Sequence, residues 1–276
     1  MIQESQHSSS PVSLFKNLWR NKGLIYEMSR RDIASRYKGS VIGLGWSFFN
    51  PLLMLAVYTF VFSIVFKARW GIQGGETKLD FALLLFAGLI VHALLSDVLI
   101  RSSDLIIQNT NYVKKVVFPL ESLSVIAMGT AVFHACISCI ILLVATFFVR
   151  QGLNWTVFLI PVVIAPFIML TIGLSWIISS LGTFLRDIGQ TVSILTLVML
   201  FLAPIFYPIS AIPEVYHKFI LANPLTFIIQ QFRAIVIFGQ QPDWIGLGLY
   251  WICGFVVFCL GYVFFQKCRG GFADVL

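Results

Sequence analysis

The sequence predicts an all-α integral membrane protein with six transmembrane helices, an N-terminal amphipathic helix at the membrane interface and two short re-entrant helices before the last span. First, 58% of the 276 residues are hydrophobic and only 11% are charged, whereas soluble domains carry roughly 25% charged residues. Second, several apolar runs are about 20 residues long, which is the length that a helix needs to cross a bilayer. Third, Lys and Arg flank these runs unevenly, as the positive-inside rule describes.

The chain is expected to divide into a cytoplasmic N-terminal segment, 1–40, and a transmembrane domain, 41–276. Within 11–28, apolar side chains fall on one helical face with basic side chains opposite, which predicts a helix lying in the inner membrane interface. The alternative is a basic flank without this role, because Gly23 weakens a helix. The apolar face comprises Leu14, Phe15, Leu18, Trp19 and Ile25.

Six apolar runs are the candidate spans, and basic residues set their direction. With the N-terminus inside, thirteen Lys and Arg lie on the inner side and six on the outer side, so both termini are expected in the cytoplasm. The net charge of +7 therefore indicates orientation in the bilayer, and no nucleic acid partner is expected. The spans cover about 45–66, 81–100, 123–149, 157–185, 191–209 and 244–265.

Asn50 and Pro51 lie just inside the first apolar run, directly after a dense basic stretch. Proline removes a backbone donor and clashes with the carbonyl four residues back, so it bends a helix. Two interpretations of the bend are about equally favoured. It can be a hinge near the inner end of the span, or it can be a static packing kink.

Aromatic side chains are abundant and form two candidate groups for lining a channel. Aromatic rings can stack on the apolar faces of sugars, so such groups could guide a glycan. The alternative is that these rings face lipid or the interface, where they need no substrate. The first group lies on one helical face and comprises Tyr58, Phe62 and Phe66. The second group lies near the outer end of the fifth span and comprises Phe201, Phe206 and Tyr207.

Region 210–243 is too apolar for a free loop and too interrupted by proline for an ordinary span. Non-helical backbone at membrane depth persists only where protein or water covers its polar groups. The sequence therefore predicts two short re-entrant helices on the outer side. Their turn is expected at Asn223 and Pro224, which would form part of an outer gate.

The sequence contains no recognisable catalytic constellation and no metal-ligand cluster. It lacks GxxxxGK[ST], so no Walker-type ATP site and no cofactor are expected in this chain. His92 and His134 lie within predicted spans, where an ionisable group suggests function, but interhelical hydrogen bonding is the favoured interpretation. Asp97 and Arg101 are expected to form an i,i+4 ion pair at the inner end of the second span.

Four stretches, in this order, resemble one family. They are "RYKGSVIGLGWSFFNPLLMLAVYTFVFSIVF" from residue 36, "VKKVVFPLESL" from 113, "FLRDIGQTVSILTLVMLFLAPIFYP" from 184 and "NPLTFIIQQFR" from 223. Together they resemble the ABC-2 type permeases that export polysaccharides, which are the membrane subunits of O-antigen, capsule and teichoic acid exporters. The resemblance covers most of the chain from residue 30 onward.

The resemblance implies a homodimer with a central pore in the bacterial cytoplasmic (inner) membrane. It also implies two copies of a separate ATP-binding subunit, which would hold ATP and Mg. The substrate would be a lipid-linked polysaccharide, with O-antigen ranked first. The alternatives are export of capsule, teichoic acid or a small molecule, and, from another class, a membrane enzyme acting on lipid-linked sugars.

The resemblance also suggests roles for particular residues. Arg31, Arg36 and Lys38 could receive the anionic headgroup of the substrate, and Asn50–Pro51 would bend a pore-lining helix. A short helix near Asp104–Asn109 and the inner turn after the fourth span are the candidate contacts with the ATP-binding subunit. The contact residues are Asp104, Leu105, Gln108, Asn109, Arg186 and Asp187.

Overall fold

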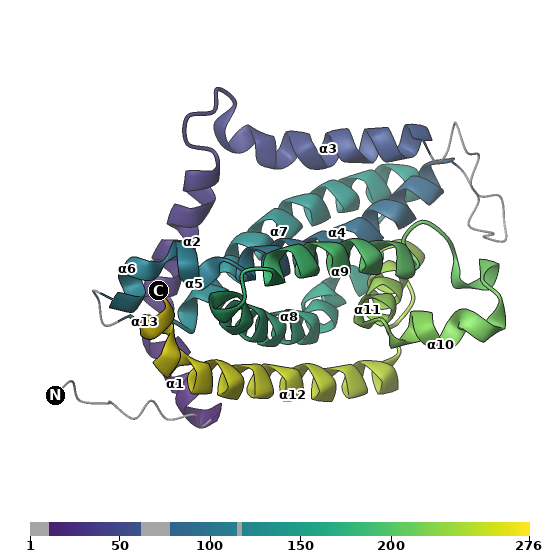
Figure 1. The fold of residues 1–276 in the computed structure, drawn as a ribbon. Coiled ribbons are helices and arrows are strands. Elements are labelled where there is room, and N and C mark those ends of the chain that lie inside the picture. Colours follow the sequence, from purple (N-terminus) through teal and green to yellow (C-terminus); the bar gives the residue numbers. More distant parts are fainter. Residues whose placement is uncertain (1–10, 62–77, 115–117) are drawn as a thin grey trace.

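The computed structural model describes residues 11–61, 78–114 and 118–276, and these residues contain helices and no strand (Figure 1). Five helical segments are long and apolar enough to cross a bilayer, so the chain is a multi-pass membrane protein. The α-helices at their centres are α3 (Trp46–Tyr58), α4 (Lys78–Ser102), α7 (Ser122–Arg150), α8 (Ile160–Phe184) and α12 (Trp244–Cys268).

The predicted span over 191–209 is shorter than expected. Helix α9 (Ile188–Leu202) has 15 residues, which is about 22 Å of helix, against about 30 Å of hydrocarbon. The helix ends where Pro204 follows, because the helical region is disfavoured for the residue before a proline. Ala203 accordingly adopts φ −78° and ψ 147°.

Helix α4 forms the centre of the bundle, and α3 lies at its edge. Figure 1 shows α4 passing among α7, α8, α9 and α11, all of which it contacts. Leu84, Leu95 and Val98 of α4 are fully buried. In contrast, Ser47 is the only buried residue of α3, and among the other described α-helices α3 contacts α7 and α4 most closely. Most of α3 therefore faces lipid or another protein.

Helices α8 and α12 are in direct backbone contact through glycine. A Cβ on Gly173 of α8 would lie 2.5 Å from the carbonyl oxygen of Val257, and a Cβ on Gly261 of α12 would overlap the carbonyl of Gly173. Small residues permit this approach between membrane helices. Trp176 of α8 fills the space beside the crossing, where its ring lies 5.0 Å from that of Phe258.

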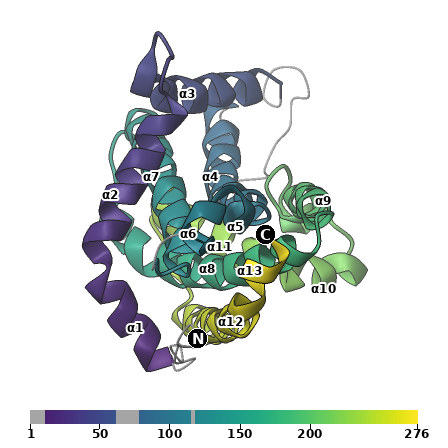
Figure 2. The same ribbon diagram turned by 60° about the vertical axis from the view of Figure 1, so that its left-hand side comes forward.

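Two helices, α1 (Pro11–Arg20) and α2 (Lys22–Arg36), meet at Asn21 and run along one flank of the bundle (Figure 2). Leu14 is fully buried, and Leu18 and Ile25 pack against the core. Helix α1 contacts α12, and α2 contacts α7. The apolar face of the 11–28 segment thus packs, at least in part, against protein.

Two short helices, α10 (Glu214–Ala222) and α11 (Pro224–Arg233), meet at an angle of 93°. The turn falls at Asn223, whose Oδ1 accepts a hydrogen bond of 3.0 Å from the Leu225 amide. Pro224 occupies the first helical position, where its missing donor costs nothing. A π-helical turn, Ala234–Phe238, follows α11.

The remaining helices are short. Helices α5 (Leu105–Gln108), α6 (Thr110–Lys114) and α13 (Phe272–Val275) lie at the same end of the bundle as α2 (Figure 1). We call this end the α5 end and the opposite end the α10 end. Arg269 links the end of α12 to the start of α7 at the α5 end, because its guanidinium pairs with Glu121 at 3.0 Å and also donates to the Phe118 carbonyl.

Candidate functional site

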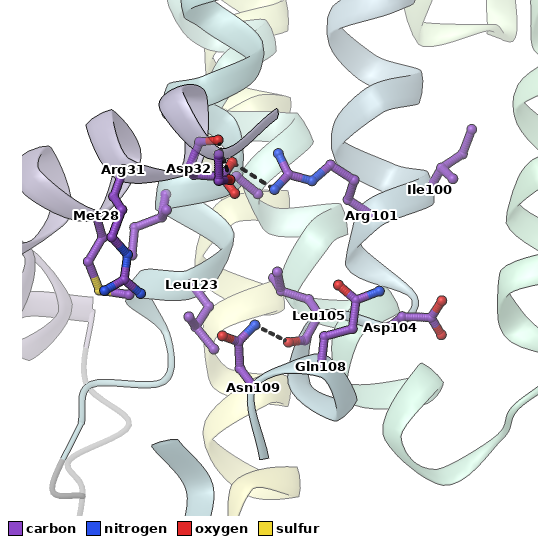
Figure 3. Close-up of a pocket in the computed structure, with 13 residues that line it drawn as sticks. Met28, Arg31, Asp32, Ile100, Arg101, Asp104, Leu105, Gln108, Asn109 and Leu123 are labelled. Atoms are coloured by element: carbon purple, nitrogen blue, oxygen red, sulfur yellow. Dashed lines mark hydrogen bonds and ion pairs between the residues drawn. The ribbon is translucent and has the colours of Figure 1, made fainter. Parts of the chain in front are cut away.

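The first cavity, which we call the α5-end cavity, has a volume of about 490 Å³ and lies among α2, α4, α5 and α7 (Figure 3). Arg31 and Asp32 enter its wall from α2, Arg101 from α4, and Asp104 and Asn109 from the segment around α5. The predicted headgroup residue Arg31 and the predicted partner-contact segment therefore share one polar cavity.

Hydrogen bonds order the charged groups of this cavity. The Arg101 guanidinium lies 2.7 Å from Asp32 Oδ2, which also accepts a 2.8 Å hydrogen bond from the Thr130 hydroxyl. Arg31 donates to the Tyr112 hydroxyl at 3.2 Å. Arg101 Nη1 is buried without a hydrogen-bond partner among the described residues. Asp32, Arg101 and Thr130 thus form one hydrogen-bonded network beside the cavity.

The predicted partner-contact residues lie at the α5 end. A short helix occurs within 104–109, with Asp104 and Gln108 exposed and Leu105 buried in the core. Arg186 and Asp187 are exposed in the turn between α8 and α9. These exposed side chains are polar or charged.

The two predicted contact segments are neighbours. Ser103 precedes α5, and a Cβ on Gly182 of α8 would overlap its carbonyl group. A Cβ on Gly189, just past the turn, would lie 3.2 Å from the Ser103 hydroxyl. The turn after α8 and the segment around α5 are therefore adjacent, which the sequence alone did not indicate.

The second cavity, which we call the α3 cavity, has a volume of about 400 Å³ and lies among α3, α4, α7 and the end of α2. Arg36, Asn50, Pro51 and Tyr58 all line it. Sequence analysis assigned these residues to a headgroup site, a kink and an aromatic group. The structure brings the three features together around one space.

The expected ion pair between Asp97 and Arg101 is wrong. Asp97 instead pairs with Arg36 of α2 at 2.9 Å, and Arg101 pairs with Asp32 of α2 at 2.7 Å. Each helix carries an acid and a base four residues apart, which places both on one face. Helix α2 packs on α7 beside α4, and each of these charges reaches an opposite charge on the other helix.

The two histidines within the spans bond between segments. The His92 imidazole lies 2.9 Å from the Thr196 carbonyl of α9, which confirms interhelical bonding. His134 of α7 lies 3.4 Å from the Tyr37 hydroxyl at the end of α2. Both histidines also line the α3 cavity.

The two predicted aromatic groups lie only partly within the described residues. Tyr58 lines the α3 cavity, while Phe62 and Phe66 lie outside the described residues. The rings of Phe201 and Phe206 stack at 5.7 Å, and the Tyr207 hydroxyl donates to the Phe201 carbonyl at 2.6 Å. Lys38, the third predicted headgroup residue, is exposed beyond α2.

Arg233, one of the six basic residues expected on the outer side, has a structural role that the sequence did not predict. The side chain is buried, and its guanidinium donates to the carbonyls of Leu84, Pro204 and Ile205 at 2.8, 2.6 and 3.1 Å. It therefore joins α11 to α4 and to the non-helical segment after α9. A single arginine inside the apolar stretch "FIIQQFRAIVIF" was the available signal, since a charge there must find partners.

No group of three or more His, Cys, Asp or Glu among the described residues is placed to hold a metal ion. The arrangement consists of apolar membrane helices around the α5-end cavity and the α3 cavity, with exposed polar segments at one end. The chain belongs to the ABC-2 type transporter family, whose model matches residues 23–237. The matched region includes both cavities.

Three curated relatives extend over most of the chain. The O-antigen export system permease protein RfbA of Klebsiella pneumoniae is 30% identical, covering 92% of this chain and 95% of that protein. The O-antigen export system permease protein RfbA of Myxococcus xanthus is 27% identical, with coverage of 84% and 87%. The polysialic acid transport protein KpsM of Escherichia coli is 21% identical, with coverage of 79% and 82%.

Proposed function

We propose that this chain is the membrane-spanning permease subunit of an ABC exporter that moves lipid-linked polysaccharide across the bacterial cytoplasmic membrane. O-antigen is the first choice of polymer. The observation that carries the proposal is the match to O-antigen export permeases, which includes 95% of one relative at 30% identity. The membrane helices and polar cavities support a transport role.

The α5 end is the cytoplasmic end in this proposal, and both chain termini are cytoplasmic. The bias of thirteen basic residues against six supports this orientation. Two copies of a separate ATP-binding subunit, which hold ATP and Mg, dock against the exposed surface formed by the segment around α5 and the turn at Arg186 and Asp187. The polar character of that surface supports docking of a soluble protein.

The lipid headgroup enters near Arg31 and Lys38, which are exposed at the α5 end. Arg36 contributes less than sequence analysis expected, because Asp97 neutralises it. Each unpaired basic residue near an anionic surface contributes about 1 kcal/mol. The substrate then passes the α3 cavity, which Tyr58 lines.

The functional unit is a homodimer in which α3 meets a second copy beside a central pore. The exposed apolar side chains of α3 support this arrangement, since only Ser47 of that helix is buried. Helices α10 and α11 are re-entrant from the outer side. Their turn at Asn223 and Pro224 forms part of the outer gate, and the 93° bend supports a segment that enters and leaves on one side.

Deleting the gene in its native host tests the proposal. We expect surface polysaccharide to disappear and lipid-linked polymer to accumulate inside, and a plasmid copy should restore export. Unchanged surface polysaccharide after deletion would contradict the proposal. Loss of capsule or teichoic acid rather than O-antigen, or loss of a small molecule, would identify an alternative cargo.

A further inference from the structure

A large groove, which we call the α2 groove, lies between the two N-terminal helices and α7. Its volume is about 1040 Å³, more than twice that of the α5-end cavity. Apolar side chains line most of it, and they include Leu18 of α1, Ile25 and Ile33 of α2, and Val132 and Phe133 of α7. All five are partly exposed. Another apolar group is therefore needed to cover them.

The groove opens at the membrane interface. Helices α2 and α7 are in close contact at Gly129, where a Cβ would lie 2.8 Å from the Ser29 hydroxyl. Figure 1 shows α2 running across the direction of the long helices at the α5 end. A helix that crosses the direction of the spans lies along the bilayer surface, so the hollow between it and α7 faces the acyl chains just below that surface.

Two cations line the α2 groove. They are Lys22 and Arg30, and none of the described lining residues is Asp or Glu. Arg30 is exposed and has no hydrogen bond or ion pair within the described part of the chain. The Lys22 ammonium lies 4.4 Å from the centre of the Trp19 ring, which leaves N–H donors for another partner. The groove therefore combines an apolar wall with groups that bind phosphate.

The positions of these cations suit one phospholipid headgroup. Lys22 and Arg30 are eight residues apart on α2, which is about 12 Å along a helix, and both side chains are long enough to reach a phosphate between them. Trp19 and Tyr26 also line the groove and are largely exposed. Such rings are enriched where a bilayer meets water. Anionic lipids concentrate around basic residues at this depth.

We propose that the α2 groove binds one anionic phospholipid, with its acyl chains against α7 and its phosphate between Lys22 and Arg30. Phospholipid is the occupant because it forms the bilayer to which the groove opens. The site is separate from the proposed entry of the cargo headgroup, since Arg31 donates to Tyr112 and lines the α5-end cavity. The proposal does not depend on which polymer the chain exports.

Photocrosslinking in vesicles of equal parts phosphatidylglycerol and phosphatidylcholine, with the same acyl chains, tests the proposal. In the purified full-length permease, p-benzoylphenylalanine replaces Tyr26 or, as the control, Val144, an exposed residue of α7 outside the groove. Mass spectrometry measures the ratio of the two lipid adducts. We expect a phosphatidylglycerol excess of about tenfold at position 26, because each basic residue favours an anionic lipid severalfold, and a ratio near one at position 144. Equal ratios at the two positions would overturn the proposal.

Neutralising the cations separates a defined site from general attraction between charges. Lys22→Gln together with Arg30→Gln should bring the ratio at position 26 close to one. Lys16→Gln together with Arg20→Gln removes the same charge from exposed residues of α1 that do not line the groove, and this variant should keep the preference. Equal loss of preference in the two double variants would show attraction to the basic segment as a whole and would contradict a site in the groove.

The identity of the occupant is tested in native membranes. The permease modified at position 26 should give mainly phospholipid adducts after irradiation in its host. A glycan-bearing lipid as the main adduct would assign the groove to the exported cargo and overturn the proposal.

Filling the groove gives an independent readout. A ligand that binds the folded state raises the melting temperature, so added phosphatidylglycerol should stabilise the detergent-purified protein more than phosphatidylcholine does. Val132→Trp fills the groove and should remove this difference, whereas Val144→Trp, on the same helix but outside the groove, should retain it. Equal effects of the two lipids on the unmodified protein would contradict the proposal.

Discussion

Arg36 of α2 and Asp97 of α4 form an ion pair across 61 residues of sequence, with 2.9 Å between Nη2 and Oδ2. A second pair, Asp32 with Arg101 at 2.7 Å, joins the same two helices. Helix α4 is the most buried span, so the pairs fix the N-terminal segment to the centre of the bundle. A movement of α2 at the α5 end would therefore act directly on the α3 cavity.

Breaking the first pair should weaken both stability and export. Asp97→Asn leaves Arg36 without its counter-charge, and we expect a loss on the order of 1 kcal/mol, because both groups are partly exposed. Thermal unfolding of the detergent-purified protein measures this, with exposed Asp104→Asn as the control. Reversing the pair, with Arg36→Asp and Asp97→Arg together, should recover most of the loss. An unchanged melting temperature for Asp97→Asn would show that the pair contributes nothing.

Removing the buried guanidinium should loosen the α10 end. Arg233→Met leaves the carbonyls of Pro204 and Ile205 without their donor, and we expect a loss of roughly 3 kcal/mol, since hydrogen bonds to charged groups contribute about 1.5–3 kcal/mol each. Protease digestion and thermal unfolding would measure it. Lys218→Met on exposed α10 is the matched control. Equal stability of the two variants would show that the Arg233 guanidinium does not stabilise the α10 end.

The glycine contact between α8 and α12 should tolerate no side chain. Gly261→Ala places a Cβ against the carbonyl of Gly173, and overpacking of this kind costs about 1–3 kcal/mol. Gly248 lies on the same helix with nothing within 4 Å of its Cβ position, so Gly248→Ala should be neutral or slightly stabilising. Folded yield and melting temperature compare the two. Equal effects would indicate that α12 is not held by this contact.

The aromatic ring in the α3 cavity should matter for export. We expect Tyr58→Ala to lower the export rate about fivefold, since ring stacking contributes roughly 1 kcal/mol. Tyr58→Phe should retain most of the rate. Val57→Ala changes the exposed neighbour and is the control. Normal export by Tyr58→Ala, with insertion verified, would assign this ring to ordinary packing.

Much of the fold was predictable because periodicity and proline act locally. Five of the six predicted spans correspond to described helices, and the turn at Asn223–Pro224 follows from a capping side chain and a proline. Pro204 also accounts for the early end of α9 from local sequence. The end was not predicted because the apolar run continues to residue 209. Composition alone does not separate an apolar helix from an apolar non-helical segment.

The candidate site was less predictable because its contacts are between helices far apart in sequence. Arg36 was identified as basic, but its ion pair with Asp97 depends on the placement of α2 beside α4 in the fold. The apolar stretch around Arg233 indicated that its charge needs partners, but it did not identify the three carbonyls from two segments that supply them. Sequence spacing predicts neighbours within one helix, whereas these partners are set by packing.

Reconstitution tests the central claim most directly. Proteoliposomes would contain the permease, its ATP-binding subunit and lipid-linked O-polysaccharide, and a glycan-degrading enzyme added outside would report polymer that has crossed. The account predicts crossing that requires both ATP and this chain, and that stops when the partner cannot hydrolyse ATP. Polymer that crosses equally well without the chain, or without ATP hydrolysis, would contradict it.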